Sequence, residues 1–147
     1  MPNLLIEDVK NQVREVFAQL KDPTQVLFFG KKNECEFCDD TRQLVEEVVE
    51  LSEKLTLEVY DLDEDADIAK NFNVDKAPGL VIAGRAEGQI LDFGIRYAGI
   101  PSGHEFSSFI HDLVLVSGRD SGLSRKTRDF LSKLDKPVHL QVFVTPT

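Results

Sequence analysis

The sequence predicts an α/β protein, a three-layer unit in which helices cover both faces of a central mixed sheet. Two observations carry this prediction. Segments with apolar residues at helical spacing alternate along the chain with short segments whose apolar residues suit strands. The resulting order is helix, strand, helix, strand, helix, strand, strand, helix, which is the alternation typical of α/β sheets.

The first half of the chain contains two predicted helices and two predicted strands. Residues 1–20 place apolar side chains on one face of a helix, and Asp22-Pro23 ends it. Val26 to Gly30 is wholly apolar, as expected for a strand that is covered on both faces. The pattern is helical again from the cysteines to about Leu55, and Leu57 to Leu62 alternates apolar and polar residues like a strand.

The second half begins with a short predicted helix from Asp65 to Phe72. Leu80 to Ile82 and Gln89 to Ile95 are interpreted as the strands of a β-hairpin, with its turn between Gly84 and Gly88. Apolar residues at helical spacing from Phe106 to Val114 then predict another helix.

The end of the chain repeats its beginning. Arg14, Leu20, Pro23 and Phe29 recur in the same order and spacing as Arg128, Leu134, Pro137 and Phe143. We therefore expect a complete unit at residues 1–116, a Gly- and Ser-rich linker at 117–123, and the truncated start of a second unit at 124–147, consisting of a helix and a strand. The strand expected from Val138 to Val144 would lack native neighbours, and an unpaired apolar strand favours pairing with another chain, so a dimer is one expectation.

Composition excludes several classes of protein. The chain has 147 residues, a net charge of −9 and a pI near 4.8, which argues against nucleic acid as the main partner because phosphates need an excess of cations. Its apolar runs fall far short of the roughly 18 residues that span a bilayer. Acidic residues within the first 20 positions argue against a signal peptide, so we expect a cytoplasmic protein without membrane association.

The two cysteines, Cys35 and Cys38, are too few for a disulfide scaffold, and their spacing in a chain without an export signal indicates redox chemistry. They follow a predicted buried strand and are expected to open a helix, where free N–H groups and the helix dipole would stabilise a thiolate at Cys35. That thiolate could attack a substrate disulfide, and Cys38 could then resolve the mixed disulfide. We expect Cys35 to be the exposed nucleophile and Cys38 the more buried resolving cysteine.

Four acidic residues surround the pair and disfavour a second anion there, so we expect the pKa of Cys35 to be lowered less than in strongly oxidising disulfide exchange proteins. These are Glu34, Glu36, Asp39 and Asp40. Lys31 and Lys32 are expected to offset part of this charge.

Two other interpretations of the pair stay open. It could be half of a zinc or iron–sulfur site shared between chains, or an inert pair of thiols. His104 and His111 lie far from the cysteines in sequence and complete no obvious Cys2His2 site. We expect neither a metal nor a bound cofactor.

The Cys35-Glu36-Phe37-Cys38 site, Ala77-Pro78 before the hairpin and the order of elements resemble a thioredoxin/glutaredoxin-like fold. Tyr97 to Phe106 and Phe143 to Thr147 resemble, more closely, the protein disulfide oxidoreductases of heat-loving archaea and bacteria. That family has two thioredoxin-type units, each with a CxxC pair. The resemblance covers essentially the whole chain and implies a thioredoxin-like three-layer α/β/α fold with a central mixed sheet.

The resemblance also implies a cis peptide bond between Ala77 and Pro78. In such folds the proline faces the cysteines, and the backbone of the residue before it is free to pair with an extended substrate. Together with Glu36 and Phe37, which lie between the cysteines, these residues form the expected substrate-binding set.

Thioredoxins carry a buried acid six residues before the first cysteine, and Phe29 stands at that position here. Proton transfer from Cys38 is therefore expected to use water or another group such as Glu34.

The sequence thus predicts a thiol–disulfide oxidoreductase unit that acts on protein dithiols and disulfides and is recycled by an external reductase. The alternative is a non-catalytic binding or scaffold unit, with the main active site in the missing second half. A glutathione-dependent glutaredoxin is a third interpretation, but the acidic surroundings of Cys35 offer no cationic clamp for glutathione's carboxylates. The sequence does not give the direction of the reaction, because about 1.4 kcal/mol changes the potential by about 30 mV.

Overall fold

The computed structural model describes residues 2–145. The predicted order of elements is confirmed, and one further helix follows it. The elements are α1 (Glu7–Phe17), β1 (Thr24–Gly30), α2 (Cys38–Val49), β2 (Leu55–Asp61), α3 (Ala66–Asn71), β3 (Gly79–Ala86), β4 (Gln89–Ala98), α4 (His104–Ser117) and α5 (Arg125–Ser132).

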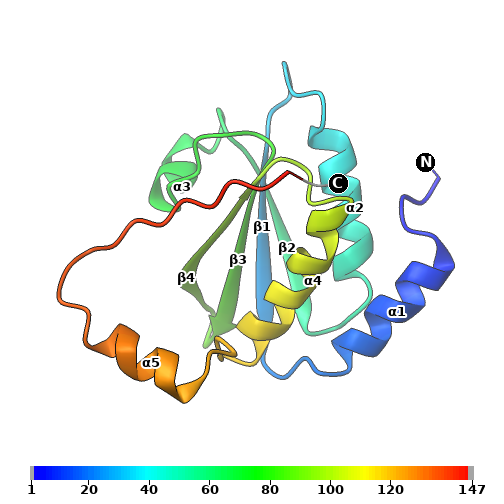
Figure 1. Ribbon diagram of the computed structural model, residues 1–147. Coiled ribbons are helices and arrows are strands. Elements are labelled where there is room, and N and C mark those ends of the chain that lie inside the picture. The colour runs from blue at the N-terminus through cyan, green and yellow to red at the C-terminus, as the bar shows by residue number, and fades with distance from the viewer. Residues whose placement is uncertain (1, 146–147) are drawn as a thin grey trace.

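The four strands form one mixed sheet in the order β2-β1-β3-β4. β1 runs parallel to β2 and antiparallel to β3, and β3 pairs with β4 as an antiparallel hairpin. Helices α1, α2 and α4 pack against one face of this sheet and α3 against the other (Figure 1). The prediction of a three-layer fold with a central mixed sheet is confirmed.

The central strand β1 explains why both faces need a helical layer. All of its residues are buried. Val26 and Phe28 belong to the core under α1, α2 and α4, whereas Leu27 and Phe29 belong to the core under α3. This division follows from the period of two along a strand, which sends successive side chains to opposite faces.

Two boundaries differ from the sequence prediction. Helix α2 begins at Cys38 and not at Cys35, because a turn at Glu36 and Phe37 separates the cysteines. The hairpin turn is confined to Glu87 and Gly88, both with positive φ (53° and 76°), and β3 continues through Gly84 to Ala86. Two residues with positive φ form a turn whose twist matches that of the flanking strands, so a longer loop is unnecessary.

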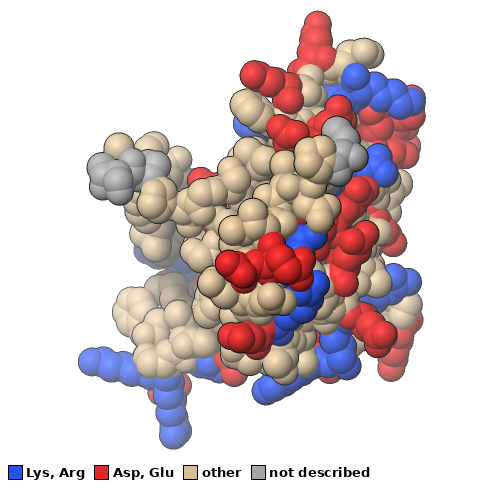
Figure 2. Space-filling model, turned by 90° about the vertical axis from the view of Figure 1, so that its right-hand side faces the viewer, with Lys and Arg blue, Asp and Glu red and all other residues tan. Residues whose placement is uncertain are grey.

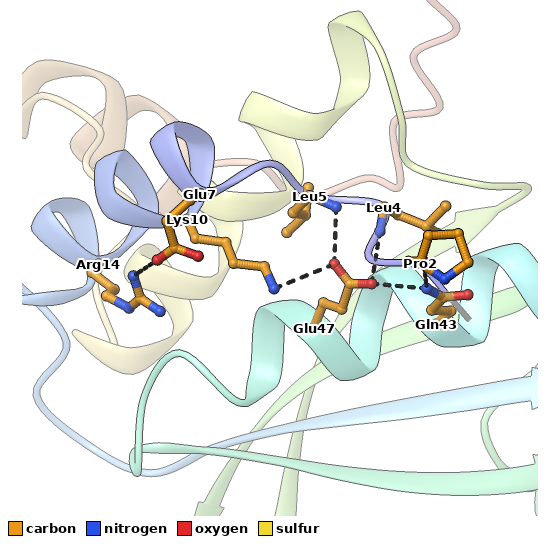
Figure 3. A network of polar contacts seen from close by, with 8 residues as sticks. All are labelled: Pro2, Leu4, Leu5, Glu7, Lys10, Arg14, Gln43 and Glu47. Carbon is orange, nitrogen blue, oxygen red and sulfur yellow. Dashed lines mark hydrogen bonds and ion pairs between the residues drawn. The ribbon is translucent and has the colours of Figure 1, made fainter.

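The N-terminal segment is held against α2 by a buried carboxylate (Figure 3). Glu47 accepts hydrogen bonds from the backbone N–H groups of Leu4 (2.8 Å) and Leu5 (2.9 Å) and from the side chain of Gln43 (2.9 Å). The ammonium group of Lys10 lies 3.8 Å away. These contacts satisfy a charge that would otherwise be costly to bury.

The segment after α4 lies outside both cores. Helix α5 contributes no buried residue. The strand expected from Val138 to Val144 is not formed within residues 2–145, so this expectation is wrong. The large apolar side chains of this segment are 63–90% exposed. A strand requires a hydrogen-bonding neighbour, and none of the strands in the described part of the chain pairs with this segment. The division into units at 117–123 stays a prediction.

None of the helices within residues 2–145 is long and apolar enough to cross a bilayer.

Candidate active site

The two cysteines lie where β1 passes into α2, and they are joined by a disulfide bond with their Cα atoms 5.5 Å apart. Phe37, between them, is the N-cap of α2, and its carbonyl oxygen accepts hydrogen bonds from the backbone N–H (3.0 Å) and the hydroxyl (2.6 Å) of Thr41. The first turn of α2 is thereby fixed next to the disulfide.

The two sulfur-bearing residues differ in exposure. Cys38 is the first residue of α2 and is 4% exposed, packed in the core under α1, α2 and α4. Its Sγ accepts a hydrogen bond from the backbone N–H of Lys31 at 3.4 Å. Cys35 is only partly buried at the edge of the same core. The structure places Cys35 before the helix, contrary to the sequence expectation, but agrees with the predicted order of exposure.

Gly30 allows β1 to approach Cys38 closely. A Cβ atom at this position would lie 2.7 Å from Cε1 of Phe28 and 3.6 Å from Sγ of Cys38. Sequence reasoning missed both Gly30 and Phe28 as parts of the site. The available signal was a glycine at the end of a buried strand, directly before the cysteine loop.

Phe29 lies on the other face of the sheet. Its ring stacks on Tyr60 with centroids 5.3 Å apart and contacts Phe72, in the core under α3. The side chain on the cysteine side is Phe28, so Phe29 stands at the sequence position of the thioredoxin acid but lies on the face away from Cys38. The number of residues between β1 and the cysteines depends on the length of the loop. The sequence position of Phe29 therefore does not show which face of the sheet its side chain occupies.

A cleft of about 340 Å³ lies beside Cys38. Phe28, Gly30 and Cys38 line it, together with charged side chains that include Asp61. Hydrogen bonds from the backbone N–H groups of Glu64 and Asp63 hold the pKa of Asp61 below its usual value, so this carboxylate is ionised at neutral pH. Glu34 does not line the cleft, and its expected part in proton transfer stays a prediction.

The cis peptide bond between Ala77 and Pro78 is present, as the resemblance implied. It lies at the end of the sheet that carries the cysteine loop, because Phe29 near the end of β1 pairs with Gly79 at the start of β3. Ala77 and Cys35 both pack against the core under α1, α2 and α4. Within residues 2–145 the backbone of Ala77 makes no hydrogen bond, whereas Pro78 accepts one from the N–H of Gly99 (2.8 Å).

The acidic residues around the disulfide are all exposed, and so is nearly half of the Phe37 side chain (48%). Lys31 forms an ion pair with Asp63 (3.4 Å), and Lys32 with Glu64. The hydrogen bond to Glu64 raises the pKa of Lys32. The two lysines therefore pair with acidic residues in the segment after β2, so they offset little of the negative charge around Cys35.

The two histidines considered for a metal site both lie in α4. His104 opens α4, and His111 lies within the same helix. Among residues 2–145 there is no group of three or more His, Cys, Asp and Glu side chains that could hold a metal ion.

Comparisons with known proteins agree with this site. No family model matches the chain. The chain is 30% identical over 144 residues to NADH dehydrogenase of Bacillus subtilis, and 26% identical over 144 residues to the F subunit of alkyl hydroperoxide reductase in Staphylococcus epidermidis. Both matches cover 98% of this chain but only 25% of the relative, so the chain spans about a quarter of the length of these relatives.

Two solved structures are similar as well. The protein disulfide oxidoreductase of Aeropyrum pernix matches 88% of this chain and 55% of its own, with 29% identity and a TM-score of 0.75. The F subunit of the Enterococcus faecalis alkyl hydroperoxide reductase matches 90% of this chain and 62% of its own, with 26% identity and a TM-score of 0.77. The predicted resemblance and thioredoxin-like fold are confirmed: the chain has a thioredoxin-like fold with a Cys35–Cys38 disulfide, and it is similar to protein disulfide oxidoreductases.

Proposed function

We propose that this unit exchanges disulfides with protein substrates, with Cys35 as the nucleophile and Cys38 as the resolving cysteine. The observation that carries the proposal is the unequal burial of the two cysteine residues joined by one disulfide. A substrate sulfur can approach the partly buried Cys35, whereas Cys38, packed in the core, is restricted to attacking its neighbour.

The proposed substrate-binding residues are Glu36, Phe37, Ala77 and Pro78. The exposed ring of Phe37 offers apolar contact, and the unpaired backbone of Ala77 supports pairing with an extended peptide, as in strand addition. Both features lie at the end of the sheet that carries the cysteines.

The partners we propose are protein dithiols and disulfides, together with an external reductase that recycles the cysteines. The names of two relatives, NADH dehydrogenase and alkyl hydroperoxide reductase, fit a unit that passes electrons between a reductase and another protein. A cytoplasmic location and a heat-loving source, both taken from the sequence, belong to the same proposal.

We also propose that residues 1–116 form the redox unit, that 117–123 are a linker, and that 124–147 start a second unit. The exposure of α5 and of the apolar residues after it supports this division. The same exposed segment supports pairing with a second chain as a dimer.

The assignment of roles is tested by trapping. Cys38→Ser should accumulate a mixed disulfide between Cys35 and a protein substrate, because the resolving step is lost. Cys35→Ser should accumulate far less. Gel electrophoresis without reductant, followed by mass spectrometry, measures both adducts. Equal trapping by both variants would contradict the assignment, and no trapping by either would favour a scaffold unit.

A further inference from the structure

The surface around Cys35 carries negative charge that is not balanced locally. Four exposed acids lie before, between and after the cysteines: Glu34, Glu36, Asp39 and Asp40. Figure 2 shows carboxylates at the end of the molecule that carries this loop, with basic side chains among them.

The basic side chains nearest in sequence are engaged elsewhere. Lys31 and Lys32 pair with Asp63 and Glu64, and Arg42 pairs with Glu46 on α2 (2.7 Å). On the loop before the cis peptide bond, Asp75 and Lys76 pair with each other at 3.0 Å and add no net charge. A partner that reaches Cys35 therefore meets an uncompensated acidic surface.

An exposed apolar ring lies within this charge. Phe37, between the two cysteines, is 48% exposed. A protein that brings a sulfur to Cys35 has to pass beside this ring, and covering the ring would add a favourable apolar contact. The acids alone would define no site, but the partly exposed Cys35 residue and the exposed Phe37 ring fix where a partner must approach.

We propose that the site selects protein partners whose reacting cysteine is flanked by Lys or Arg side chains, with Phe37 as the apolar contact. The inference rests on the proposed disulfide exchange and names the class of substrate. Exposed charges act over a Debye length of about 8 Å at physiological ionic strength. Complementary charge at a rim raises the rate of encounter by about 10 to 10³-fold and suppresses partners of like charge.

The exchange itself is balanced in sulfur and electrons. In the reduced unit, the Cys35 thiolate attacks one sulfur of a substrate disulfide, forms a mixed disulfide and releases one substrate thiolate. The Cys38 thiolate then attacks the Cys35 sulfur and releases the second. Two electrons pass to the substrate, the unit ends as the Cys35–Cys38 disulfide, and the two protons of the dithiol pass through solvent to the released thiolates.

The test uses the reduced chain and three symmetric disulfides, each made of two copies of a short peptide with one cysteine flanked by Lys, Ser or Asp. Each rate constant is divided by that of dithiothreitol with the same peptide, which removes the peptide's own reactivity. We expect the Lys peptide to react about 10-fold or more faster than the Asp peptide at low salt. The ratio should approach one near 1 M salt, where the Debye length is about 3 Å.

Two matched variants locate the effect. Replacing the four acids (E34Q/E36Q/D39N/D40N) should bring the Lys-to-Asp ratio close to one. Removing as many exposed acids elsewhere (E15Q/E50Q/E53Q/D135N) should leave it unchanged. Because the ratio compares two substrates on the same thiol, any change in the reactivity of Cys35 cancels.

Three outcomes would separate the claims. A wild-type ratio near one at low salt would overturn the inference and leave the proposed function standing. An equal loss of the ratio in both variants would also overturn it, because net charge and not this surface would be responsible. No reaction with any peptide, the uncharged Ser peptide included, would overturn the proposed function itself.

Discussion

Glu47 is the residue on which the attachment of the N-terminal segment depends. It is 7% exposed and is surrounded by two backbone N–H groups, an amide and an ammonium group. Burial alone would raise the pKa of Glu47, but the hydrogen bonds from Leu4, Leu5 and Gln43 and the charge of Lys10 outweigh it and lower the pKa. The folded protein therefore favours the ionised carboxylate.

Replacing this carboxylate by an amide gives a prediction for stability. Glu47→Gln should lower the free energy of unfolding at pH 7 by about 2 kcal/mol, because an ionised acceptor of buried hydrogen bonds is lost. A carboxyl with a lowered pKa contributes stability above its unfolded value, near 4.5, and loses it as the pH falls through the folded value. The difference between wild type and variant should therefore shrink below about pH 4.5.

Urea unfolding of both proteins between pH 3 and pH 8 measures this difference. Glu50→Gln, an exposed position at the end of the same helix, is the control and should change stability by no more than about 0.5 kcal/mol. A pH-independent difference between wild type and Glu47→Gln would show that the charge of Glu47 is not what holds the segment.

Sequence reasoning found the redox residues but not this anchor. Cys35 and Cys38 were predicted because the CxxC spacing is a local pattern, whereas the place of Pro78 was implied by the resemblance to thioredoxin-like folds. Glu47 was missed because the backbone N–H groups from which it accepts, those of Leu4 and Leu5, lie more than 40 residues away, and nothing in α2 itself indicates them. The face that Phe29 occupies was not predicted for a related reason, since a residue count does not determine the side of a sheet.

At the scale of elements, the strands were predicted best where both faces are buried. Val26 to Gly30 is a continuous apolar run in the sequence, and β1, which also includes Thr24 and Gln25, is buried throughout in the structure. The failures lie at ends and turns. The hairpin turn occupies Glu87 and Gly88, and glutamate is not a residue whose type predicts a positive φ.

The strand expected from Val138 to Val144 shows the limit of local patterns. Its residues have the apolar character of β1, but no neighbouring strand pairs with them in the described part of the chain. Propensity for a strand becomes structure only when hydrogen-bonding partners and a covering layer are present.

Helix α5 and the segment after it give the second prediction. A chain ending at residue 123 should unfold at the same urea concentration as the full chain, because α5 buries no residue. An exposed ion pair, Arg128 with Asp120, is among the few contacts that would be lost. Helices this short are marginal without packing, so the removed part contributes little structure of its own.

Chemical unfolding and sedimentation of the two chains together test the division into units. A lower midpoint for the shortened chain would contradict the proposal that residues 1–116 are a complete unit. A dimer that persists after the deletion would show that the C-terminal segment is not the surface that joins two chains.

At the scale of the whole molecule, the fold positions one reactive pair at one end of the sheet. β1 brings Gly30 and the cysteine loop there, β3 brings the cis peptide bond, and α2 begins at the buried sulfur. The same arrangement leaves the partly exposed Cys35 beside an acidic surface, so chemistry and partner choice are properties of the same end of the molecule.

The reduction potential of the Cys35–Cys38 pair tests the central claim most directly. The chain is equilibrated at pH 7 in a series of glutathione buffers, extended to lower potentials with dithiothreitol, alkylated and measured by mass spectrometry, with Cys35→Ser as the control. We expect a reversible two-electron transition between about −120 and −270 mV, the span of known exchange proteins, and none in the control. A pair that stays oxidised or stays reduced throughout the series would contradict the account, because it could not turn over as a disulfide exchange site.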